Sequence, residues 1–322
     1  ERGAILGKYG SAKKQSTIDT DKGRILRHIK PLIGNMLVID LTQTSISKFL
    51  KDVTAGKTAI VERSGKLRGK AVVEGGPGTA SRTVGLLGGI LSFAVSEGIL
   101  ERNPAAGVRR PPVRRTKRRL SPSEYAAFGA ALAEAERRGA AEQGLAAIHV
   151  VALTGCRKGE IEGLRWEEVN SRRSELVLSN SKEGRSVRPV GAAALAVIKA
   201  RPKSGDTGFV FASSRNDRQK FGGLPSVWDK VANLAGFTDV TLHTLRHSYA
   251  SVAADMGYVE TTIAALLGHA TKSMTSSYVH HLDSVLVSAA DRVSRAIQLM
   301  MEGVTFADAK KSVEATQEAE IT

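Results

Sequence analysis

Apolar residues recur every three or four positions through much of the first hundred residues. The pattern holds from Thr20 to about Val53 and again from Ser81 to Glu97, which predicts amphipathic helices. Residues 55–80, between the two, are rich in Gly and Lys and contain only short β-prone pieces. We expect a loop or a small hairpin there. This part of the chain therefore predicts a helical domain interrupted by one irregular segment.

A stretch of prolines and cations follows. Asn103-Pro104 and Pro111-Pro112 keep the chain extended, because proline disfavours helix at its own position and at the one before it. A run of positive charges overlaps these prolines and predicts a domain linker that either is merely solvated or follows a DNA phosphate backbone. The candidate DNA-binding cations are Arg109, Arg110, Arg114, Arg115, Lys117, Arg118 and Arg119.

The chain becomes helical again after this linker. Ser121 is followed by Pro122 and, three residues on, by Glu124, the order typical of a capping box at a helix start. Two β-prone runs at 175–178 and 186–190 predict a hairpin with its turn at 182–184. The remaining apolar periodicity predicts helices near 121–138, 142–153, 191–200, 225–235, 243–256, 260–267 and 271–281.

The last forty residues divide into two kinds of sequence. An apolar stripe from Leu282 to Ile297 predicts a helix, which packs either on its own domain or on a neighbouring copy of the chain. From Met301 onward the sequence is polar and mildly acidic, so we expect the chain to fray.

Charge is distributed very unevenly along the chain. Residues 1–119 hold 24 Lys and Arg against 9 Asp and Glu, so they carry the whole net charge of +15. The remaining residues hold 47 − 24 = 23 basic and 32 − 9 = 23 acidic side chains and balance to zero. This asymmetry favours a module that grips a polyanion joined to a neutral module with another task. A basic surface that serves only solubility is the alternative.

Several classes of protein are disfavoured by composition. Cys156 is the only cysteine, so neither an intramolecular disulfide nor a Cys-based zinc site is expected, and a reducing, cytoplasmic compartment fits best. No apolar run approaches the ~20 residues that span a bilayer. The glycines at 75–78 lack the Gly-Lys-Ser/Thr ending of a nucleotide-binding loop and predict a plain turn. The chain begins at Glu1 rather than Met, which we interpret as the loss of an N-terminal segment.

Residues with chemical potential are densest between His243 and Tyr278. His243 and Arg246 are three positions apart on a predicted helix and so share a face. His269 follows Gly268, which stands where a helix end favours a left-handed residue, and Tyr278 comes nine residues later. Upstream, Arg157 is expected in the first turn of a helix, with Glu160 three residues on, and Lys182 lies at the predicted hairpin turn. Each of these residues alone has an ordinary structural explanation, as a core-capping tyrosine, an i,i+3 ion pair or an exposed turn.

Taken in order, these motifs resemble the tyrosine recombinases, and within them the phage-type integrases. The resemblance covers roughly residues 20–290. It depends on Thr-Gly-Cys-Arg-Lys-Gly-Glu at 154–160, Lys182, His-Thr-Leu-Arg-His-Ser at 243–248, Leu-Gly-His at 267–269, and Tyr278. The chain departs from the family at Thr244, where the family usually carries Asp.

The resemblance implies a site-specific DNA recombinase that cleaves and rejoins strands through a 3′-phosphotyrosine and Holliday-junction intermediates. Tyr278 would be the nucleophile, and the other catalytic residues would be Arg157, Lys182, His243, Arg246 and His269, with Glu160 orienting Arg157. It also implies double-stranded DNA as partner, a homotetramer on that DNA, and accessory DNA-bending proteins. We expect no ATP, no cofactor, no metal and no membrane. His247, His280 and His281 lack a carboxylate or cysteine at ligand spacing.

The expected fold is mainly α and clamps DNA. We assign 1–15 to a remnant or linker, 16–105 to a helical core DNA-binding domain and 106–120 to the basic linker. Residues 121–300 form a mostly helical α+β catalytic domain with a small antiparallel sheet, and 301–322 form a polar tail. Two other functions share many of these features. A type IB-like topoisomerase would relax supercoils as a monomer, and a non-cutting DNA-binding regulator would never form a covalent adduct.

Overall fold

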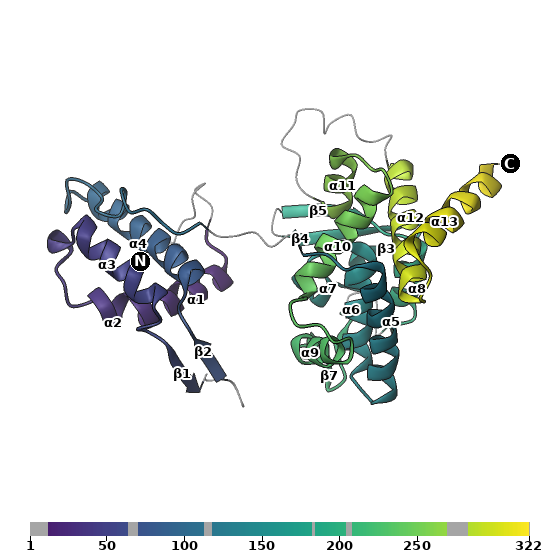
Figure 1. The fold of residues 1–322 in the computed structure, drawn as a ribbon, viewed down its shortest axis with the longest axis horizontal. Helices are drawn as coiled ribbons and strands as arrows, with labels where there is room; N and C mark the ends of the chain where they lie inside the picture. Colours follow the sequence, from purple (N-terminus) through teal and green to yellow (C-terminus); the bar gives the residue numbers. More distant parts are fainter. Residues whose placement is uncertain are drawn as a thin grey trace. The chain divides into compact units, whose positions relative to one another are not determined.

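The computed structural model describes residues 12–63, 70–112, 118–181, 184–203, 208–268 and 283–321. It divides into two units, Glu1–Arg115 (unit 1) and Thr116–Thr322 (unit 2). Helices dominate both units, and the strands form small antiparallel sheets of two or three strands (Figure 1). The prediction of a mainly α fold with a small antiparallel sheet is confirmed.

Unit 1 is built on two helices that face each other across a small core. Helix α3 (Gln43–Thr54) contributes Ile46, Phe49 and Val53, and helix α4 (Pro77–Ser96) contributes Val84 and Leu91, all nearly inaccessible to solvent. Their apolar residues recur at helical spacing, so burial of one face stabilises both helices. The preceding elements are α1 (Gln15–Arg24), the π-helical η1 (Ile25–Ile29), α2 (Lys30–Ile33) and the short 3₁₀ helix η2 (Val38–Asp40).

The irregular segment of unit 1 contains a hairpin, as one of the two expectations had it. Strand β1 (Ile60–Arg63) pairs antiparallel with β2 (Lys70–Val73), with Ile60 opposite Val73. Helix α4 then begins at Pro77, four residues earlier than predicted. The reason is local, because Gly76 adopts a left-handed φ of 84° and Pro is favoured in a first helical turn.

By length and composition, α4 is the one helix among the described residues that could cross a membrane. Its apolar face is accounted for in another way. Ala80, Val84, Leu87, Leu91 and Ala94 are buried in the core of unit 1. A helix that packs in the core of a folded domain can be equally long and apolar. The burial of these residues makes α4 a core helix of unit 1.

Unit 2 is organised around helix α6 (Glu142–Thr154), which is buried along almost its whole length. Helices α5 (Pro122–Arg137), α8 (Ala192–Lys199), α9 (Leu224–Leu234) and α10 (Leu242–Asp255) surround it. The other helices are α7 (Lys158–Glu162), the 3₁₀ helix η3 (Trp166–Glu168), α11 (Glu260–Leu267), α12 (Asp283–Met301) and α13 (Phe306–Ile321). Residues 271–281, expected to be helical, lie outside the described residues.

The larger sheet of unit 2 packs against α11 and α12 through its strand β5 (Gly184–Pro189). Strands β3 (Val169–Asn170), β4 (Glu175–Ser181) and β5 form an antiparallel sheet, and β4 and β5 are the predicted pair. A second hairpin of β6 (Ala212–Ser213) and β7 (Asn216–Lys220) was not expected. All five residues of β7 are polar and exposed, so the strand has no alternation of apolar and polar positions to reveal it.

Helix α12 packs on its own unit, the first of the two alternatives for the C-terminal helix. Val293, Ala296 and Ile297 are fully buried in the unit 2 core. Asp291 Oδ1 accepts a hydrogen bond of 2.6 Å from the backbone N–H of Ala192 at the start of α8. On another side, Gly129 of α5 lies so close that a Cβ there would stand 2.0 Å from the Met301 carbonyl oxygen.

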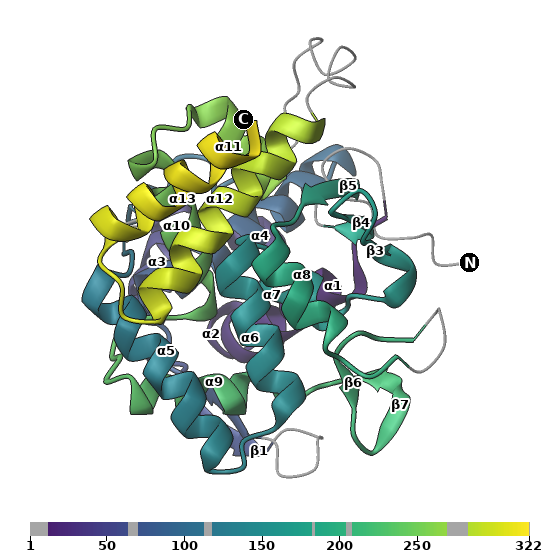
Figure 2. The same ribbon diagram turned by 90° about the vertical axis from the view of Figure 1, so that its right-hand side faces the viewer.

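The expectation of a frayed end after Met301 is wrong. Residues Phe306–Ile321 form helix α13, which runs beside α12 (Figure 2). Thr305 caps its start by accepting the backbone N–H of Asp308. Ala309 and Val313 are buried against the core. Two apolar contacts and a cap are too sparse a pattern to outweigh a polar composition in a sequence-based prediction.

Candidate active site

Three predicted catalytic residues, Lys182, His269 and Tyr278, lie outside the described residues. The same holds for the linker cations Arg114, Arg115 and Lys117. Their roles stay predictions. The structure places four other members of the set, all within unit 2, and these are Arg157, Glu160, His243 and Arg246.

Helix α10 carries two of these residues and begins with a capping box. Thr241 Oγ1 accepts the backbone N–H of Thr244, and the Thr244 hydroxyl accepts the N–H of Thr241 at 3.0 Å. The departure from the family pattern at Thr244 therefore leaves the helix start intact, because a hydroxyl can accept this hydrogen bond as a carboxylate does. His243 and Arg246 follow in the first turns, with their positions fixed by the cap.

Arg246 is buried, with 4% of its surface exposed, and its guanidinium bridges two helix ends. Nη1 donates to the Gly155 carbonyl at 2.7 Å, after α6, and Nη2 donates to the Leu267 carbonyl at 3.1 Å, at the end of α11. Helix C-termini carry partial negative charge, so they stabilise a cation there. Burial, helped by the positive charge of Arg157, lowers the pKa of Arg246 to about 10. The side chain is still charged at neutral pH.

Both helices that hold Arg246 end in a left-handed glycine. Gly155 has φ 63° and Gly268 has φ 60°, a conformation that other residues adopt with strain. A Cβ on Gly155 would also stand 2.8 Å from the ring of Tyr249 and 2.9 Å from Leu267. The glycines therefore let α6 and α11 end close together, and this brings their free carbonyls to one guanidinium.

Arg157 lies two residues after Gly155, at the residue just before α7 rather than inside its first turn. Its side chain is 22% exposed, so it reaches the surface beside the buried Arg246. Glu160 holds it twice. Oε2 of Glu160 accepts the backbone N–H of Arg157 at 2.8 Å, and Oε1 accepts its Nη1 at 2.9 Å. The ion pair between Arg157 and Glu160 is therefore present, and the role of Glu160 in orienting Arg157 for catalysis stays a prediction.

Only 6% of the Glu160 side chain is exposed, and this burial on its own would raise the pKa of its carboxyl group. The backbone N–H of Arg157, the charge of Arg188 and the Arg157 guanidinium outweigh burial and lower the pKa. Glu160 is thus ionised at neutral pH and neutralises part of the charge gathered here.

Arg188, the third cation of this cluster, was not predicted from the sequence. Only 1% of the surface of Arg188 is exposed, and its Nη2 donates to Glu160 Oε1 at 3.0 Å. Alternation in the sequence would place the apolar Val187 inward and Arg188 outward, so the local pattern could not have found it. In the β4–β5 register Arg188 stands opposite the buried Leu176, while its neighbour Val187 is 43% exposed. The side chain must therefore point inward.

His243 is the most exposed of the described site residues and pairs with His247 one turn later. Their ring centroids lie 4.5 Å apart in an edge-to-face arrangement. Burial lowers the pKa of His243, and the charges of His247, Arg246 and Arg157 lower it further. His243 is therefore neutral at pH 7 and able to accept a proton.

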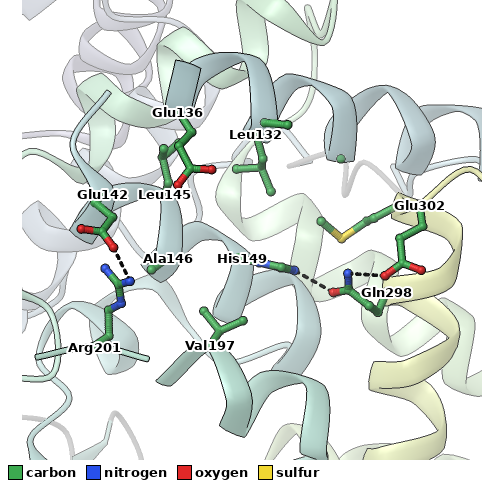
Figure 3. A pocket seen from close by; sticks show the side chains of 13 residues that line it. Leu132, Glu136, Glu142, Leu145, Ala146, His149, Val197, Arg201, Gln298 and Glu302 are labelled. Carbon is green, nitrogen blue, oxygen red and sulfur yellow. Dashed lines mark hydrogen bonds and ion pairs between the residues drawn. The ribbon is translucent and has the colours of Figure 1, made fainter. Parts of the chain in front are cut away.

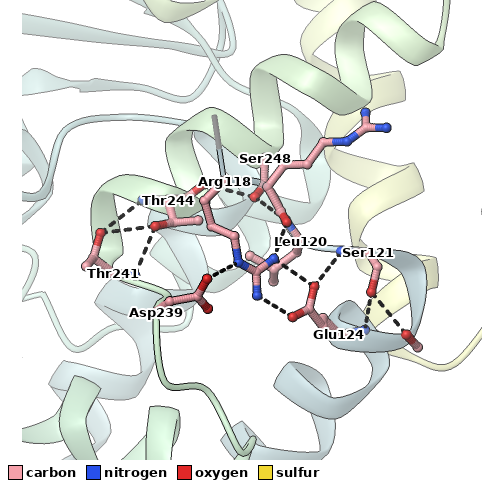
Figure 4. Close-up of polar contacts among 10 residues, drawn as sticks. Arg118, Leu120, Ser121, Glu124, Asp239, Thr241, Thr244 and Ser248 are labelled. Carbon is pink, nitrogen blue, oxygen red and sulfur yellow. Dashed lines mark hydrogen bonds and ion pairs between the residues drawn. The ribbon is translucent and has the colours of Figure 1, made fainter. Parts of the chain in front are cut away.

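The described linker cations differ in their surroundings. Arg118 forms ion pairs with Glu124 and with Asp239, the latter at 2.9 Å (Figure 4). Arg119 pairs with Asp255 at 2.7 Å. The next residue, Leu120, donates its N–H to Ser248 Oγ on α10. Arg109 and Arg110, in unit 1, are exposed. Contact of Arg118 or Arg119 with phosphate would require these side chains to exchange carboxylate partners, and it stays a prediction.

A separate hollow of about 330 Å³ lies among α5, α6, α8 and α12 (Figure 3). His149 hydrogen-bonds Gln298 at 2.8 Å, which ties α12 to α6, and Arg201 pairs with Glu142 at the other side. None of the four described site residues lines it. Among the described residues no group of three His, Cys, Asp or Glu could hold a metal ion, and the prediction of metal-free chemistry stays a prediction.

The model of the phage integrase family matches residues 118–285. Similar curated proteins include a tyrosine recombinase XerC of Roseiflexus castenholzii and a XerD of Mycobacterium tuberculosis, each 27% identical. The alignments cover 63% and 66% of this chain, and 68% and 74% of those proteins. A XerC-like recombinase of Caldanaerobacter subterraneus is 23% identical, over 64% of this chain and 63% of that protein. The chain thus spans about two thirds of the length of these relatives.

Solved structures resemble the fold. A lambda integrase (75–356) dimer bound to a COC′ core site gives a TM-score of 0.62 at 19% identity, over 82% of this chain and 91% of that one. A lambda integrase tetramer bound to a Holliday junction gives 0.62 at 20% identity, over 82% and 74%. At such identities the likeness concerns the fold alone.

Proposed function

The chain belongs to the phage integrase family, and from that premise we propose how its residues cleave DNA. As a tyrosine recombinase it is an enzyme that cleaves and rejoins DNA strands at specific sites. In the proposed reaction Tyr278 Oη forms a bond to the scissile phosphorus while the bond from phosphorus to the 5′ oxygen breaks. The product is a 3′-phosphotyrosine and a free 5′ hydroxyl. A 5′ hydroxyl of the partner strand then attacks the same phosphorus, the bond from phosphorus to Tyr278 Oη breaks, and the joined strand is released from the tyrosine.

The two arginines would bind the non-bridging oxygens of the phosphate. Guanidinium groups match phosphate geometry and keep their charge near neutral pH. The observation that carries this assignment is the way Arg246 is held. Its guanidinium is fixed by two helix-end carbonyls, beside the partly exposed Arg157 and its Glu160 partner. Donors fixed before the substrate arrives stabilise charge that develops in the transition state without reorganising.

Proton transfer would be divided among the other residues. Lys182 would protonate the departing 5′ oxygen, and His243 would accept a proton or orient a donor. The lowered pKa of His243, which follows from its burial and from the nearby charges, supports the acceptor role. His269 would hydrogen-bond the same phosphate. The ester bond to Tyr278 retains the energy of the phosphodiester, so the proposed cycle needs neither ATP nor a metal.

Double-stranded DNA is the proposed partner, held by the basic first third of the chain together with unit 2. The positive charge of residues 1–119 supports a backbone-binding role for residues 16–105 and the linker at 106–120. Residues 121–300 would form the catalytic domain. A homotetramer on two sites, accessory DNA-bending proteins and action in the cytoplasm complete the proposal.

The nucleophile is tested with a nicked suicide substrate that traps the covalent intermediate. We expect the wild-type chain to form an adduct mapped by mass spectrometry to Tyr278, with or without EDTA. Tyr278→Phe removes only the phenolic oxygen, so it should bind the same DNA normally and form no adduct. An adduct that survives in Tyr278→Phe would assign the nucleophile to another residue. Loss of the wild-type adduct in EDTA would contradict the metal-free mechanism.

A further inference from the structure

Arg188 occupies a place where the sheet would ordinarily hold an apolar side chain. It lies on β5 opposite Leu176, which is fully buried, and its own residue is only 1% exposed. A buried guanidinium is expensive unless its N–H groups and its charge are compensated. Replacing such a buried ionic group and its partner by apolar residues of similar size often leaves the stability of a protein unchanged or increases it. The presence of arginine therefore needs a reason beyond packing.

The contacts of Arg188 lead directly to the candidate site. Nη2 donates to Glu160 Oε1 at 3.0 Å, the same oxygen that accepts Nη1 of Arg157 at 2.9 Å. Nη1 of Arg188 donates to the hydroxyl of Ser186, on its own strand, at 2.8 Å. Glu160 is thus held by Arg188 from strand β5 and by Arg157 from the residue before α7, which leaves its carboxylate little freedom to turn.

Arg188 also lies directly against the turn that ends α11. A Cβ built on Gly268 would stand 0.8 Å from Nη1 of Arg188 and 2.0 Å from its Cζ. The guanidinium therefore fills the space that any side chain at position 268 would need. The next residue in the sequence is His269, and the carbonyl of the preceding Leu267 holds Arg246. The buried side chain of Arg188 thus contacts Glu160 on α7 and also lies against the Gly268 turn that ends α11.

We propose that Arg188 is a positioning residue for strand cleavage, which sets Arg157 through Glu160 and supports the Gly268 turn without touching DNA. This inference rests on the proposed function. Arg188 would be a third guanidinium, buried inside unit 2, that holds the phosphate-binding residues in position.

The charge balance agrees with this role. Arg157, Arg188 and Arg246 contribute three positive charges against the one negative charge of Glu160. The positive charge of Arg188 is among the causes that lower the pKa of Arg246. Such an excess is unfavourable in the free protein and is relieved when a phosphate enters, so Arg188 contributes to the positive potential at the phosphate as well as to geometry.

The test compares four full-length variants, Arg188→Met, Arg188→Lys, Glu160→Gln and the double variant Glu160→Gln/Arg188→Met. For each we would measure the single-turnover cleavage rate at saturating suicide substrate, the Kd for DNA and the melting temperature. Arg201→Met is the matched control. Arg201 has a side chain 9% exposed and a glutamate partner, Glu142, in the separate hollow.

We expect Arg188→Met to cleave about 10- to 100-fold more slowly, the range typical of groups that orient a ligand from behind, with the Kd unchanged. Arg188→Lys should recover part of the rate. The double variant should lose less rate than the product of the two single losses, because the two residues share one contact and only the support of the Gly268 turn is lost in addition. Arg201→Met should cleave at the wild-type rate.

Several outcomes would overturn the inference. They are an unchanged rate in Arg188→Met, a weaker Kd with the saturating rate intact, or a double variant whose loss is the product of the two single losses. If Arg188→Met does not fold, the rates of Arg188→Lys and of the double variant decide. Failure of the proposed function is a separate result, because the wild-type chain would then form no covalent adduct in the same assay.

Discussion

Two groups of arginines in unit 2 use the same side chain in opposite ways. Arg157, Arg188 and Arg246 lie in or beside the core and donate to helix-end carbonyls and to one buried carboxylate. The side chains of Arg118 and Arg119 are 26% and 54% exposed, and they pair with the acidic side chains of Glu124, Asp239 and Asp255, which are 29%, 63% and 44% exposed. The first group is fixed before DNA arrives, whereas the second can change partners cheaply, because exposed ion pairs contribute little stability.

This difference suggests that chemistry and affinity are divided between the two groups. A transition state profits from donors that need no reorganisation, and such donors require a folded core to hold them. Attraction to a polyanion requires only charge near the surface, and it falls as salt is added. Three comparisons between variants separate these two tasks.

The largest effect is expected for the buried group. Arg246→Ala removes a donor fixed by the Gly155 and Leu267 carbonyls and should slow single-turnover cleavage by about 10²–10³-fold at saturating DNA. Arg119→Ala, the surface control, should change that rate less than about threefold. Circular dichroism melts would verify that both variants fold. Comparable rate losses in the two variants would mean that buried and surface arginines contribute equally to the cleavage rate.

The second prediction concerns acid stability. The pKa of Glu160 is lowered below its ordinary value of 4.5, although burial opposes this, because the Arg157 N–H and the charge of Arg188 favour the ionised form. A carboxylate with a lowered pKa stabilises the fold above its ordinary pKa and loses that contribution as the pH falls through the lowered value. Wild type should therefore exceed Glu160→Gln in unfolding free energy by about 1.5–3 kcal/mol at pH 7.

That difference should shrink steadily below pH 4.5 in urea unfolding measured at several pH values. Asp239→Asn provides the comparison, because its exposed carboxylate should give a far smaller difference at every pH. A gap between wild type and Glu160→Gln that stays constant down to pH 3 would mean that the Glu160 charge does not stabilise the unit.

The smallest effect is expected for the linker. Each phosphate contact contributes about 0.9 to the slope of log K against log salt concentration. Arg109→Ala/Arg110→Ala removes two exposed cations and should flatten the slope by up to about 1.8. Arg118→Ala/Arg119→Ala should flatten it less, since carboxylates already compete for these two side chains. Filter-binding titrations between about 50 and 200 mM salt measure both, and a larger change for the second pair would show that DNA displaces the carboxylates.

Much of the fold follows from local pattern. The periodicity of α3, α4 and α6, the cap at Ser121 and the left-handed glycines at 155 and 268 are each explained by a few neighbouring residues. The exposed strand β7 and helix α13 escaped because their sequences are polar, and their stability comes from pairing with β6 and from burial of Ala309 and Val313. Such contacts join residues that local periodicity treats separately.

The sequence by itself determined which residue types are present and in what order, and from that order the family, the nucleophile candidate and the two arginines of the proposed site. Only the tertiary structure decided how a buried cation is tolerated. Arg246 needs two helix ends that are 112 residues apart in the sequence, Gly155 and Leu267, and Arg188 needs Glu160 from another element. Burial and electrostatic compensation depend on distances in space, and chain order does not encode these distances locally.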